Sequence, residues 1–300
     1  ERMGYYPTDE PVVEIIRTYV APPTEKGRLF DPCAGEGKAA AALGTALNCE
    51  TWGVELSPDR AEKAQRVLDK VYQAPWQACV LSDESVSWLY LNPPYEFDRF
   101  ENQKRLEWDF LKTTSAKLVR GGLLTYIIPQ KILGMVEVAK LLVSQYEAIT
   151  IARFPDGLYE KFKQVVVLAY KRKVFQPANE DAVHALQAQA AMELDSIQVV
   201  AEPVYHLLSA PVRGANGKPV VFKRTDWEPE EVVEATAAAG VQHTSEWLDL
   251  IHPNRSAVQL TQPVMPLKKG YIAMLMASGM MGTVRLTDEA GKPMVIKGSA

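Results

Sequence analysis

The sequence has 300 residues, which is more than one hydrophobic core usually needs, so a large domain and a smaller one are expected. Apolar residues make up 47% of the chain and charged residues 23%, a composition that argues against a disordered or fibrous protein. The longest apolar runs are short and interrupted, which argues against a membrane span. The 3 cysteines and 4 histidines are scattered without ligand-like spacing, so we expect no disulfide framework and no metal site, and we predict a cytoplasmic protein.

The charges are nearly balanced, with 33 basic and 37 acidic residues and a net charge of -4. Residues 1–174 carry 23 of each sign, and residues 175–300 carry 10 basic and 14 acidic residues. A protein that binds a phosphate backbone is often basic overall, so a nucleic-acid partner would have to be held by local patches. The acidic second half leaves room for a protein partner.

The first half alternates short apolar runs with helical stretches. Residues 28–31 (RLFD) predict a strand, which leads through a glycine-containing loop into an alanine-rich helix over 38–47. The following elements are expected in chain order: a strand over 51–56, a helix over 58–71 with Ser57 as N-cap, a strand over 87–91, a helix around 106–118, a strand over 123–128, a helix near 136–145, and strands near 148–154 and 164–172. Strands that alternate with helices predict an α/β fold, a doubly wound and mostly parallel sheet that here closes with an antiparallel edge.

The second half has a different pattern, and we place a domain boundary near residue 175, which gives domains 1–174 and 175–300. The elements expected there are a connecting helix over 176–196, a hairpin whose strands at 199–208 and 220–223 flank the turn 214–217, and a helix over 227–239. Residues 175–300 are therefore predicted to be a smaller C-terminal α+β domain, with target recognition or an accessory role as its expected function.

The loop after the first strand, residues 31–37 (DPCAGEG), is the first candidate for chemistry. Its two glycines let the backbone turn tightly at the end of a strand and approach a ligand closely. Glu55 ends the next strand, at the separation where such folds place an acid that binds ribose hydroxyls. A dinucleotide is disfavoured because Ala40 stands where a third glycine is expected and because Asp31 would repel a pyrophosphate. We therefore expect a nucleoside-bearing cofactor with a cationic part.

The second candidate is Asn92-Pro93-Pro94-Tyr95, directly after a strand, a tetrapeptide expected by chance on the order of once in a thousand chains of this length. The two prolines fix the backbone, so the Asn92 side chain and the Pro93 carbonyl form a rigid pair of acceptors. Two acceptors that grip the hydrogens of a planar exocyclic amine favour a pyramidal nitrogen, whose lone pair can then attack an electrophile. Tyr95 adds an aromatic face for stacking.

In this order and at these separations, the loop 31–37, Glu55 and residues 92–95 resemble the S-adenosylmethionine-dependent methyltransferases of exocyclic amines, above all the N6-adenine DNA methyltransferases. The resemblance covers about residues 3–174 and implies a Rossmann-like class I methyltransferase domain with the gamma-like motif order. It implies S-adenosyl-L-methionine as cofactor, DNA as partner, and a site-specific methylation of the kind found in restriction-modification systems. More narrowly, the loop 31–37 and Phe154-Pro155 ahead of residues 162–167 resemble an uncharacterised methyltransferase group often found on mobile elements.

The resemblance also implies roles for individual residues. The implied cofactor-binding residues are Tyr6, Pro7, Thr8, Asp31, Cys33, Ala34, Gly35, Gly37, Glu55, Leu56, Trp76 and Gln77. In this assignment Glu55 holds the ribose, Leu56 contacts one face of the adenine, and the segment 6–8 closes over the methionine end. Related enzymes have an acid for the adenine amine where this chain has Ala74-Pro75-Trp76-Gln77, so Gln77 or Asp83 is the expected substitute and Trp76 is expected to stack.

On the target side, the implied catalytic residues are Asn92, Pro93, Pro94 and Tyr95. Tyr95 stacks on the base after it has been extruded from the duplex, and Phe162, or else Tyr159, covers the other face. The expected contacts to the nucleic-acid backbone are Arg99, Lys104, Arg105, Lys161 and Lys163. The methyl group moves directly to the amine nitrogen without a covalent enzyme intermediate, so no catalytic cysteine is expected.

Two alternatives stay open. The same tetrapeptide serves methyltransferases of RNA bases and of protein glutamine amides, because each presents a planar amine. The second alternative is a non-catalytic module that binds nucleic acid or a partner. It is suggested by Pro75, which stands in place of an acid, and by the acidic second half.

Overall fold

The computed structural model describes residues 6–95, 105–225, 283–287 and 293–297. The chain divides into two units, residues 1–228 and 229–300. In the second unit, strands β12 (Thr283–Thr287) and β13 (Pro293–Lys297) pair antiparallel. The division falls later than the boundary predicted near residue 175.

The first unit is built on a seven-stranded sheet with the order β4-β3-β2-β6-β7-β9-β8. Its strands are β2 (Gly27–Asp31), β3 (Cys49–Glu55), β4 (Lys70–Gln73), β6 (Val86–Leu91), β7 (Leu118–Pro129), β8 (Tyr146–Arg153) and β9 (Gln164–Lys171). In this order, the strands β4, β3, β2, β6 and β7 run parallel, and β9 runs antiparallel to both β7 and β8. The prediction of a doubly wound, mostly parallel sheet with an antiparallel edge is confirmed.

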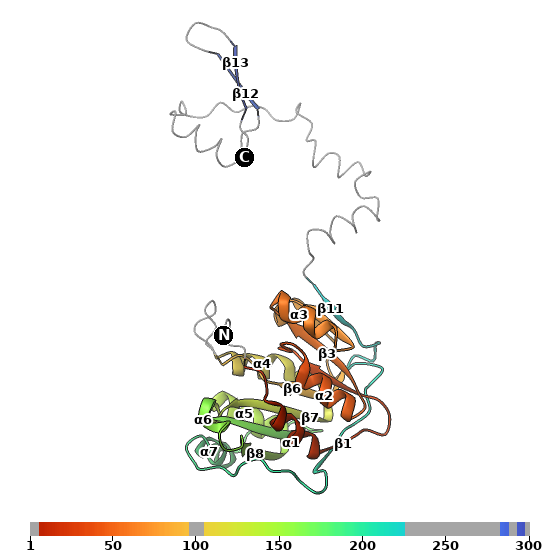
Figure 1. Cartoon of the computed structure of the whole chain (residues 1–300), viewed down its shortest axis with the longest axis vertical. Coiled ribbons are helices and arrows are strands. Elements are labelled where there is room, and N and C mark those ends of the chain that lie inside the picture. Colours follow the sequence, from red (N-terminus) through yellow and green to blue (C-terminus); the bar gives the residue numbers. More distant parts are fainter. Residues whose placement is uncertain (1–5, 96–104, 226–282, 288–292, 298–300) are drawn as a thin grey trace. The chain divides into compact units, whose positions relative to one another are not determined.

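Helices cover both faces of this sheet (Figure 1). One cluster of buried side chains joins the sheet to α1 (Glu10–Thr18), α2 (Lys38–Ala46) and α3 (Pro58–Gln65), and the other joins it to α4 (Leu106–Thr114), α5 (Val136–Gln145) and α7 (Glu180–Ala188). Neighbouring residues of one strand belong to different clusters, as Leu29 and Phe30 of β2 do. This follows from the two-residue repeat of a strand, which sends successive side chains to opposite faces.

The helix predicted over 58–71 ends earlier than expected. Ser57 occupies the N-cap position, although its side chain makes no capping hydrogen bond, and α3 stops at Gln65. The Asp69 carboxylate then accepts hydrogen bonds from the backbone N–H of Thr51, at 2.7 Å, and from its hydroxyl, at 2.9 Å. These bonds fix the turn that leads into β4, so residues 70 and 71 join the sheet.

Residues 176–225 belong to the first unit. Short strand β10 (Tyr205–His206) pairs in parallel with β1 (Val20–Ala21), and β11 (Phe222–Arg224) pairs antiparallel with β5 (Cys79–Leu81). The turn predicted at 214–217 forms, with an antiparallel bridge between Arg213 and Pro219. The predicted strands at 199–208 and 220–223 do not pair with each other, because β10 and β11 pair with different strands of the first unit. The connecting helix predicted over 176–196 is observed as α7 alone, and the helix predicted over 227–239 lies outside the described residues.

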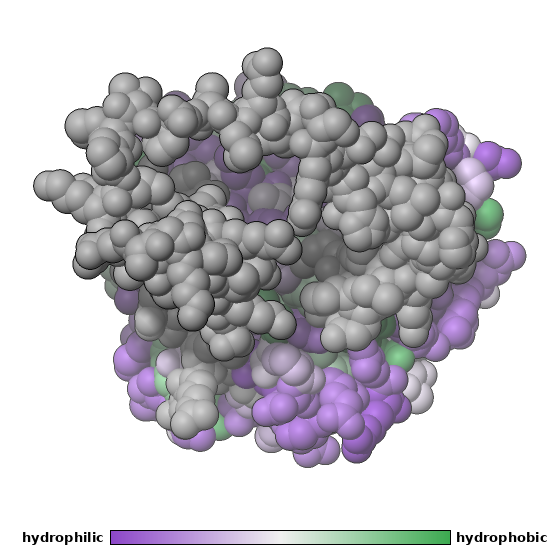
Figure 2. All heavy atoms as spheres, turned by 90° about the horizontal axis from the view of Figure 1, so that it is seen from above, coloured by the Kyte–Doolittle hydropathy of each residue, from purple (hydrophilic) through white to green (hydrophobic). Residues whose placement is uncertain are grey.

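Hydrophilic side chains predominate on the coloured part of the face drawn in Figure 2. Among the helices of the described residues, none has the length and apolar character that crossing a membrane requires. The described residues also hold no group of His, Cys, Asp and Glu side chains that could bind a metal ion.

Candidate active site

The loop 31–37 leaves the carboxyl end of β2 and turns back into α2. Gly35 and Gly37 have φ of 57° and 78°, left-handed conformations that glycine adopts without steric cost. The backbone N–H of Gly35 donates to Glu55 Oε2 at 2.8 Å. The loop is thus tied to the end of the neighbouring strand β3.

Glu55 is the last residue of β3 and is 5% exposed. Its Oε1 accepts hydrogen bonds from the Ser57 backbone N–H, at 2.8 Å, and from Arg60 Nε and Nη2, at 3.0 and 2.7 Å. Burial of a carboxylate is costly unless the group is paired and hydrogen-bonded, and these partners provide that compensation. Leu56 follows with 54% of its surface exposed, an apolar surface directly beside this acid.

Asp31, at the end of β2, is 3% exposed and accepts a hydrogen bond from the Cys33 backbone N–H at 3.0 Å. Burial raises the pKa of Asp31 to about 7. Burial also raises the pKa of the Cys33 thiol well above its ordinary value, which disfavours the nucleophilic thiolate. The loop 31–37 and Asn92 follow strands β2 and β6, which pair in parallel with Phe30 opposite Leu89. The glycine loop and the Asn92 turn therefore leave neighbouring strands at the same edge of the sheet.

Asn92 follows β6 and connects three segments of the chain. Its Nδ2 donates to the Tyr6 carbonyl at 2.8 Å and to Thr8 Oγ1 at 3.1 Å, and its Oδ1 accepts from the Tyr95 hydroxyl at 2.6 Å. The Tyr95 hydroxyl accepts in turn from Gln164 Nε2 at 2.6 Å. The Asn92 side chain is thus held in one orientation by partners that are distant in the sequence.

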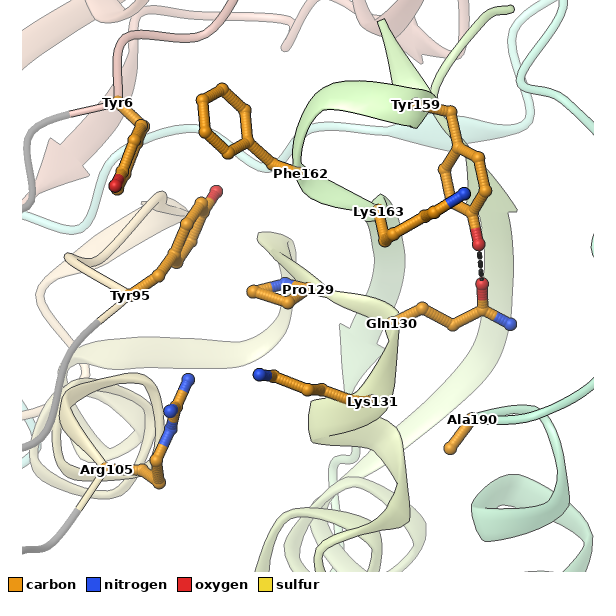
Figure 3. A pocket seen from close by; sticks show the side chains of 10 residues that line it. All are labelled: Tyr6, Tyr95, Arg105, Pro129, Gln130, Lys131, Tyr159, Phe162, Lys163 and Ala190. Atoms are coloured by element: carbon orange, nitrogen blue, oxygen red, sulfur yellow. Dashed lines mark hydrogen bonds between the residues drawn. The ribbon is translucent and has the colours of Figure 1, made fainter.

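Aromatic rings gather beside this turn (Figure 3). Tyr6 stacks on Tyr95 with 5.3 Å between ring centroids and an interplanar angle of 8°, and it meets Phe162 at 4.5 Å and 56°. The three rings line a cavity of about 380 Å³, whose wall also includes Arg105, Lys131 and Lys163. The structure therefore brings Tyr6, which was predicted to contact the cofactor, into the wall of the cavity beside the Asn92 turn.

Phe162 and Tyr159 lie in the short helix α6 (Tyr159–Phe162), and they differ in what they contact. Phe162 meets the ring of Tyr6, whereas the Tyr159 hydroxyl donates to Gln130 Oε1 (Figure 3). Lys163 Nζ lies 4.8 Å from the centroid of the Tyr159 ring. Of the two candidates for the second stacking position, Phe162 is the one next to the aromatic cluster.

Trp76 is a core side chain in this structure. It is 6% exposed, packs against Phe30 with 5.3 Å between centroids, and donates from Nε1 to Thr113 Oγ1 at 3.0 Å. The expected open stacking surface is therefore absent at Trp76, because its apolar ring fills the core instead. Gln77 is exposed and donates to Asp109 Oδ2 at 3.2 Å, and Asp83 pairs with Lys117 at 2.6 Å.

The remaining predicted residues have simpler positions. Pro7 and Lys161 are exposed, and Ala34 forms part of the glycine loop, where its N–H donates to the Val54 carbonyl at 2.9 Å. Arg99 and Lys104 lie outside the described residues.

Sequence reasoning missed several residues of this site. Tyr90, whose hydroxyl is 2.6 Å from Thr8 Oγ1, lies two positions before Asn92, so the strand repeat could have placed both on one face. Lys131 follows the carboxyl end of β7, an edge where ligand-binding residues gather. Arg60 and Gln164 carry no local signal, because their partners lie on other elements.

The sequence profile of an uncharacterised methyltransferase family, DUF6094, matches residues 1–210. The chain belongs to this family. Its fold is the Rossmann-like class I methyltransferase fold, and a family of methyltransferases with this fold implies S-adenosylmethionine as the cofactor. The two buried acids at the ends of β2 and β3, the glycine loop between them and the exposed Leu56 fit a cofactor with a cationic end, a ribose and an adenine ring. Comparison with curated proteins gives no match.

Several solved structures are similar to this chain. A predicted O-methyltransferase from Agrobacterium tumefaciens is 22% identical, with 60% of this chain and 97% of that chain covered and a TM-score of 0.39. A methyltransferase from Pyrococcus furiosus is 15% identical, with 57% and 88% covered and a TM-score of 0.41. An RNA methyltransferase from Salinibacter ruber in complex with S-adenosyl-L-homocysteine is 13% identical, with 58% and 99% covered and a TM-score of 0.36. Similarity at this level carries no argument about the substrate.

Proposed function

We propose that this methyltransferase transfers a methyl group to the N6 amine of adenine in DNA. The observation that carries the proposal is that the glycine loop and the Asn92 turn follow the adjacent parallel strands β2 and β6, in which Phe30 lies opposite Leu89. This pairing supports a rigid pair of amine acceptors beside the loop that fits the cofactor. The aromatic cavity next to this turn supplies a place for the base.

Asn92 Oδ1 and the Pro93 carbonyl accept the two hydrogens of the amine. In the structure, the Tyr95 hydroxyl donates a hydrogen bond to Asn92 Oδ1 at 2.6 Å. The Tyr95 hydroxyl also contacts Gln164, so it keeps one partner when the amine displaces it from Asn92. The exchange costs little, because one neutral hydrogen bond replaces another.

The aromatic cluster holds the base by stacking. The Tyr6 ring lies nearly parallel on Tyr95, and a base that stacks on that face takes the place of Tyr6. Phe162 is 42% exposed and adjoins the same rings. Base stacking on aromatic side chains stabilises binding by roughly 1–3 kcal/mol per base.

Bound S-adenosylmethionine supplies an activated methyl group on a sulfonium. Asp31 and the backbone of the loop 31–37 bind its cationic amino-acid end, Glu55 accepts from its ribose hydroxyls, and Leu56 packs on its adenine. Asn92 and Pro93 orient the attacking nitrogen, and one amine hydrogen then leaves as a proton to water. Orientation of the two reactants provides most of the rate acceleration.

The second unit, residues 229–300, is the proposed part for recognition of the target sequence. Cross-linking of the full chain to DNA that contains bromouracil, followed by peptide mapping, tests this role. We expect cross-linked peptides from residues 229–300, and cross-links confined to residues 1–228 would contradict it.

Labelled methyl transfer to duplex DNA, RNA and protein acceptors in parallel tests the proposal. Nucleoside digestion of the DNA is expected to place the label in N6-methyldeoxyadenosine. Label in RNA alone or in protein glutamine would assign the same machinery to another planar amine. Binding of nucleic acid without any transfer, together with no heat on titration with S-adenosylmethionine, would indicate a binding module instead.

A further inference from the structure

The cavity of about 380 Å³ has two chemically different parts (Figure 3). The rings of Tyr6, Tyr95 and Phe162 gather in one part, and the side chains of Arg105 and Lys131 point toward each other in another. An aromatic part and a cationic part together match a ligand that joins a planar ring to a negative charge.

We propose that Arg105 and Lys131 form a phosphate subsite, which binds the backbone phosphate next to the nucleotide whose base enters the aromatic part. This inference rests on the proposed function and adds a residue, Lys131, that no sequence motif indicated. It also distinguishes a nucleic-acid substrate from a protein substrate, because a protein glutamine amide has no phosphate.

Arg105 is held in place at the cavity wall. Its Nε donates to Glu107 Oε2 at 3.0 Å, and its Nη2 donates to Glu107 Oε1. Glu107 is fully buried, and its backbone carbonyl accepts a hydrogen bond from the Tyr126 hydroxyl at 2.8 Å. Such a two-pronged pairing fixes the plane of the guanidinium, so little side-chain entropy is lost when an anion binds.

Lys131 approaches from the turn after β7, and its ammonium is directed toward Arg105 (Figure 3). Among the described residues, no hydrogen bond or ion pair engages this ammonium, and none of the described residues that line the cavity is acidic. Glu107 pairs with Arg105 and its carboxylate also interacts electrostatically with Lys131, so the ionised forms of the three groups together carry one positive charge, which an anion in the cavity can neutralise. Lys163 adds a further positive charge to the same cavity.

The Lys131→Gln variant, together with Lys131→Arg and Lys112→Gln, tests the subsite. Lys112 is an exposed lysine of α4, so its substitution removes the same charge from a position that does not line the cavity. The probe is a short single-stranded oligodeoxyadenosine with a fluorescent label, and anisotropy measures its affinity for the full chain at increasing salt. Labelled methyl transfer and the melting temperature are measured for each variant alongside binding.

We expect Lys131→Gln to weaken binding about fivefold and to reduce the slope of log affinity against log salt by roughly 0.7. Lys131→Arg restores both, whereas Lys112→Gln matches the parent protein. If the parent binds and methylates DNA but Lys131→Gln behaves like Lys112→Gln, the phosphate subsite is wrong and the proposed function stands. If the parent neither binds the oligonucleotide nor methylates DNA, the proposed function fails and this inference fails with it.

Discussion

The two sides of the site differ in how the chain builds them. The cofactor side, residues 31–37 with Glu55, forms within one strand-helix-strand unit, and the bond from Gly35 to Glu55 spans 20 positions. The target side is formed by residues 92–95, Tyr6, Phe162 and Gln164. Its bond from Asn92 to Tyr6 spans 86 positions, and the bond from Gln164 to Tyr95 spans 69. The first side is a local motif, and the second exists only after the sheet has assembled.

The substitution with the largest expected effect disrupts the target side alone. Asn92→Ala removes an acceptor from the amine, and we expect the rate of methyl transfer to fall by roughly a thousandfold, as when a preorganised transition-state contact is lost. Titration calorimetry with S-adenosylmethionine is expected to give a nearly unchanged affinity. Asn216→Ala, in an exposed turn of the same unit, is the matched control. Full activity of Asn92→Ala would refute its assigned role.

A substitution with a smaller expected effect disrupts the cofactor side alone. Glu55→Gln removes the charge that accepts from ribose hydroxyls, so we expect the affinity for S-adenosylmethionine to fall by roughly 10- to 100-fold, the range for hydrogen bonds to a charged group. Transfer at saturating cofactor is expected to persist. Glu50→Gln, an ion-paired glutamate on the same strand, serves as control. An unchanged cofactor affinity in Glu55→Gln would contradict the assignment.

The pH dependence of cofactor binding sharpens the same comparison. Because burial raises the pKa of Asp31 to about 7, this side chain is mostly protonated below that pH. A cationic cofactor prefers the carboxylate, so we expect affinity to rise about tenfold per pH unit toward pH 7 and then to level off. Calorimetry in buffers of different ionisation enthalpy measures the released proton. Asp31→Asn is expected to abolish this dependence, and a pH-independent affinity in the parent protein would count against it.

The raised pKa of Asp31 also affects the folding stability of the protein without its cofactor. The folded state keeps the Asp31 proton that the unfolded chain releases near its ordinary pKa of 3.8. This group therefore favours folding at low pH, and its contribution to stability decreases as the pH rises from about 4 to about 7.

Trp76→Phe separates packing from cofactor binding. The change leaves a smaller ring and removes the hydrogen bond to Thr113, so we expect the free energy of unfolding to fall by about 1–2 kcal/mol. Denaturant unfolding measures this loss, and the affinity for S-adenosylmethionine is expected to stay within a factor of about two of the parent. A large loss of affinity at unchanged stability would instead make Trp76 a cofactor contact.

Tyr6→Ala carries the smallest expected effect and concerns the target side. Its ring stacks on the face of Tyr95 that we assign to the base, and an aromatic pair stabilises by about 0.5–1.5 kcal/mol. Removing the ring is expected to lower the KM for DNA by roughly 2- to 10-fold, because the base no longer displaces it. Tyr6→Phe keeps the ring and is expected to match the parent. A KM for DNA that is unchanged or higher in Tyr6→Ala would exclude such a displacement.

The contrast between the two sides also explains how far the sequence could predict the structure. The alternation of strands and helices, the glycine loop and the Asn92 turn follow from local patterns and from the rule that parallel strands end at one edge. The turn predicted at 214–217 forms, but the strands predicted on its two sides pair with β1 and β5 rather than with each other, which a local turn signal cannot predict. Trp76 was assigned to the cofactor from its position in the motif order, whereas burial against Phe30 decides its place. Lys131 and Gln164 enter the site only through the packing of distant elements.

Nucleoside analysis of DNA by mass spectrometry tests the central claim most directly. DNA is taken from a methylation-deficient host that expresses either the parent protein or Asn92→Ala. The account predicts N6-methyldeoxyadenosine with the parent and none above background with the variant. Equal amounts of this nucleoside in both samples, or none in either, would contradict it.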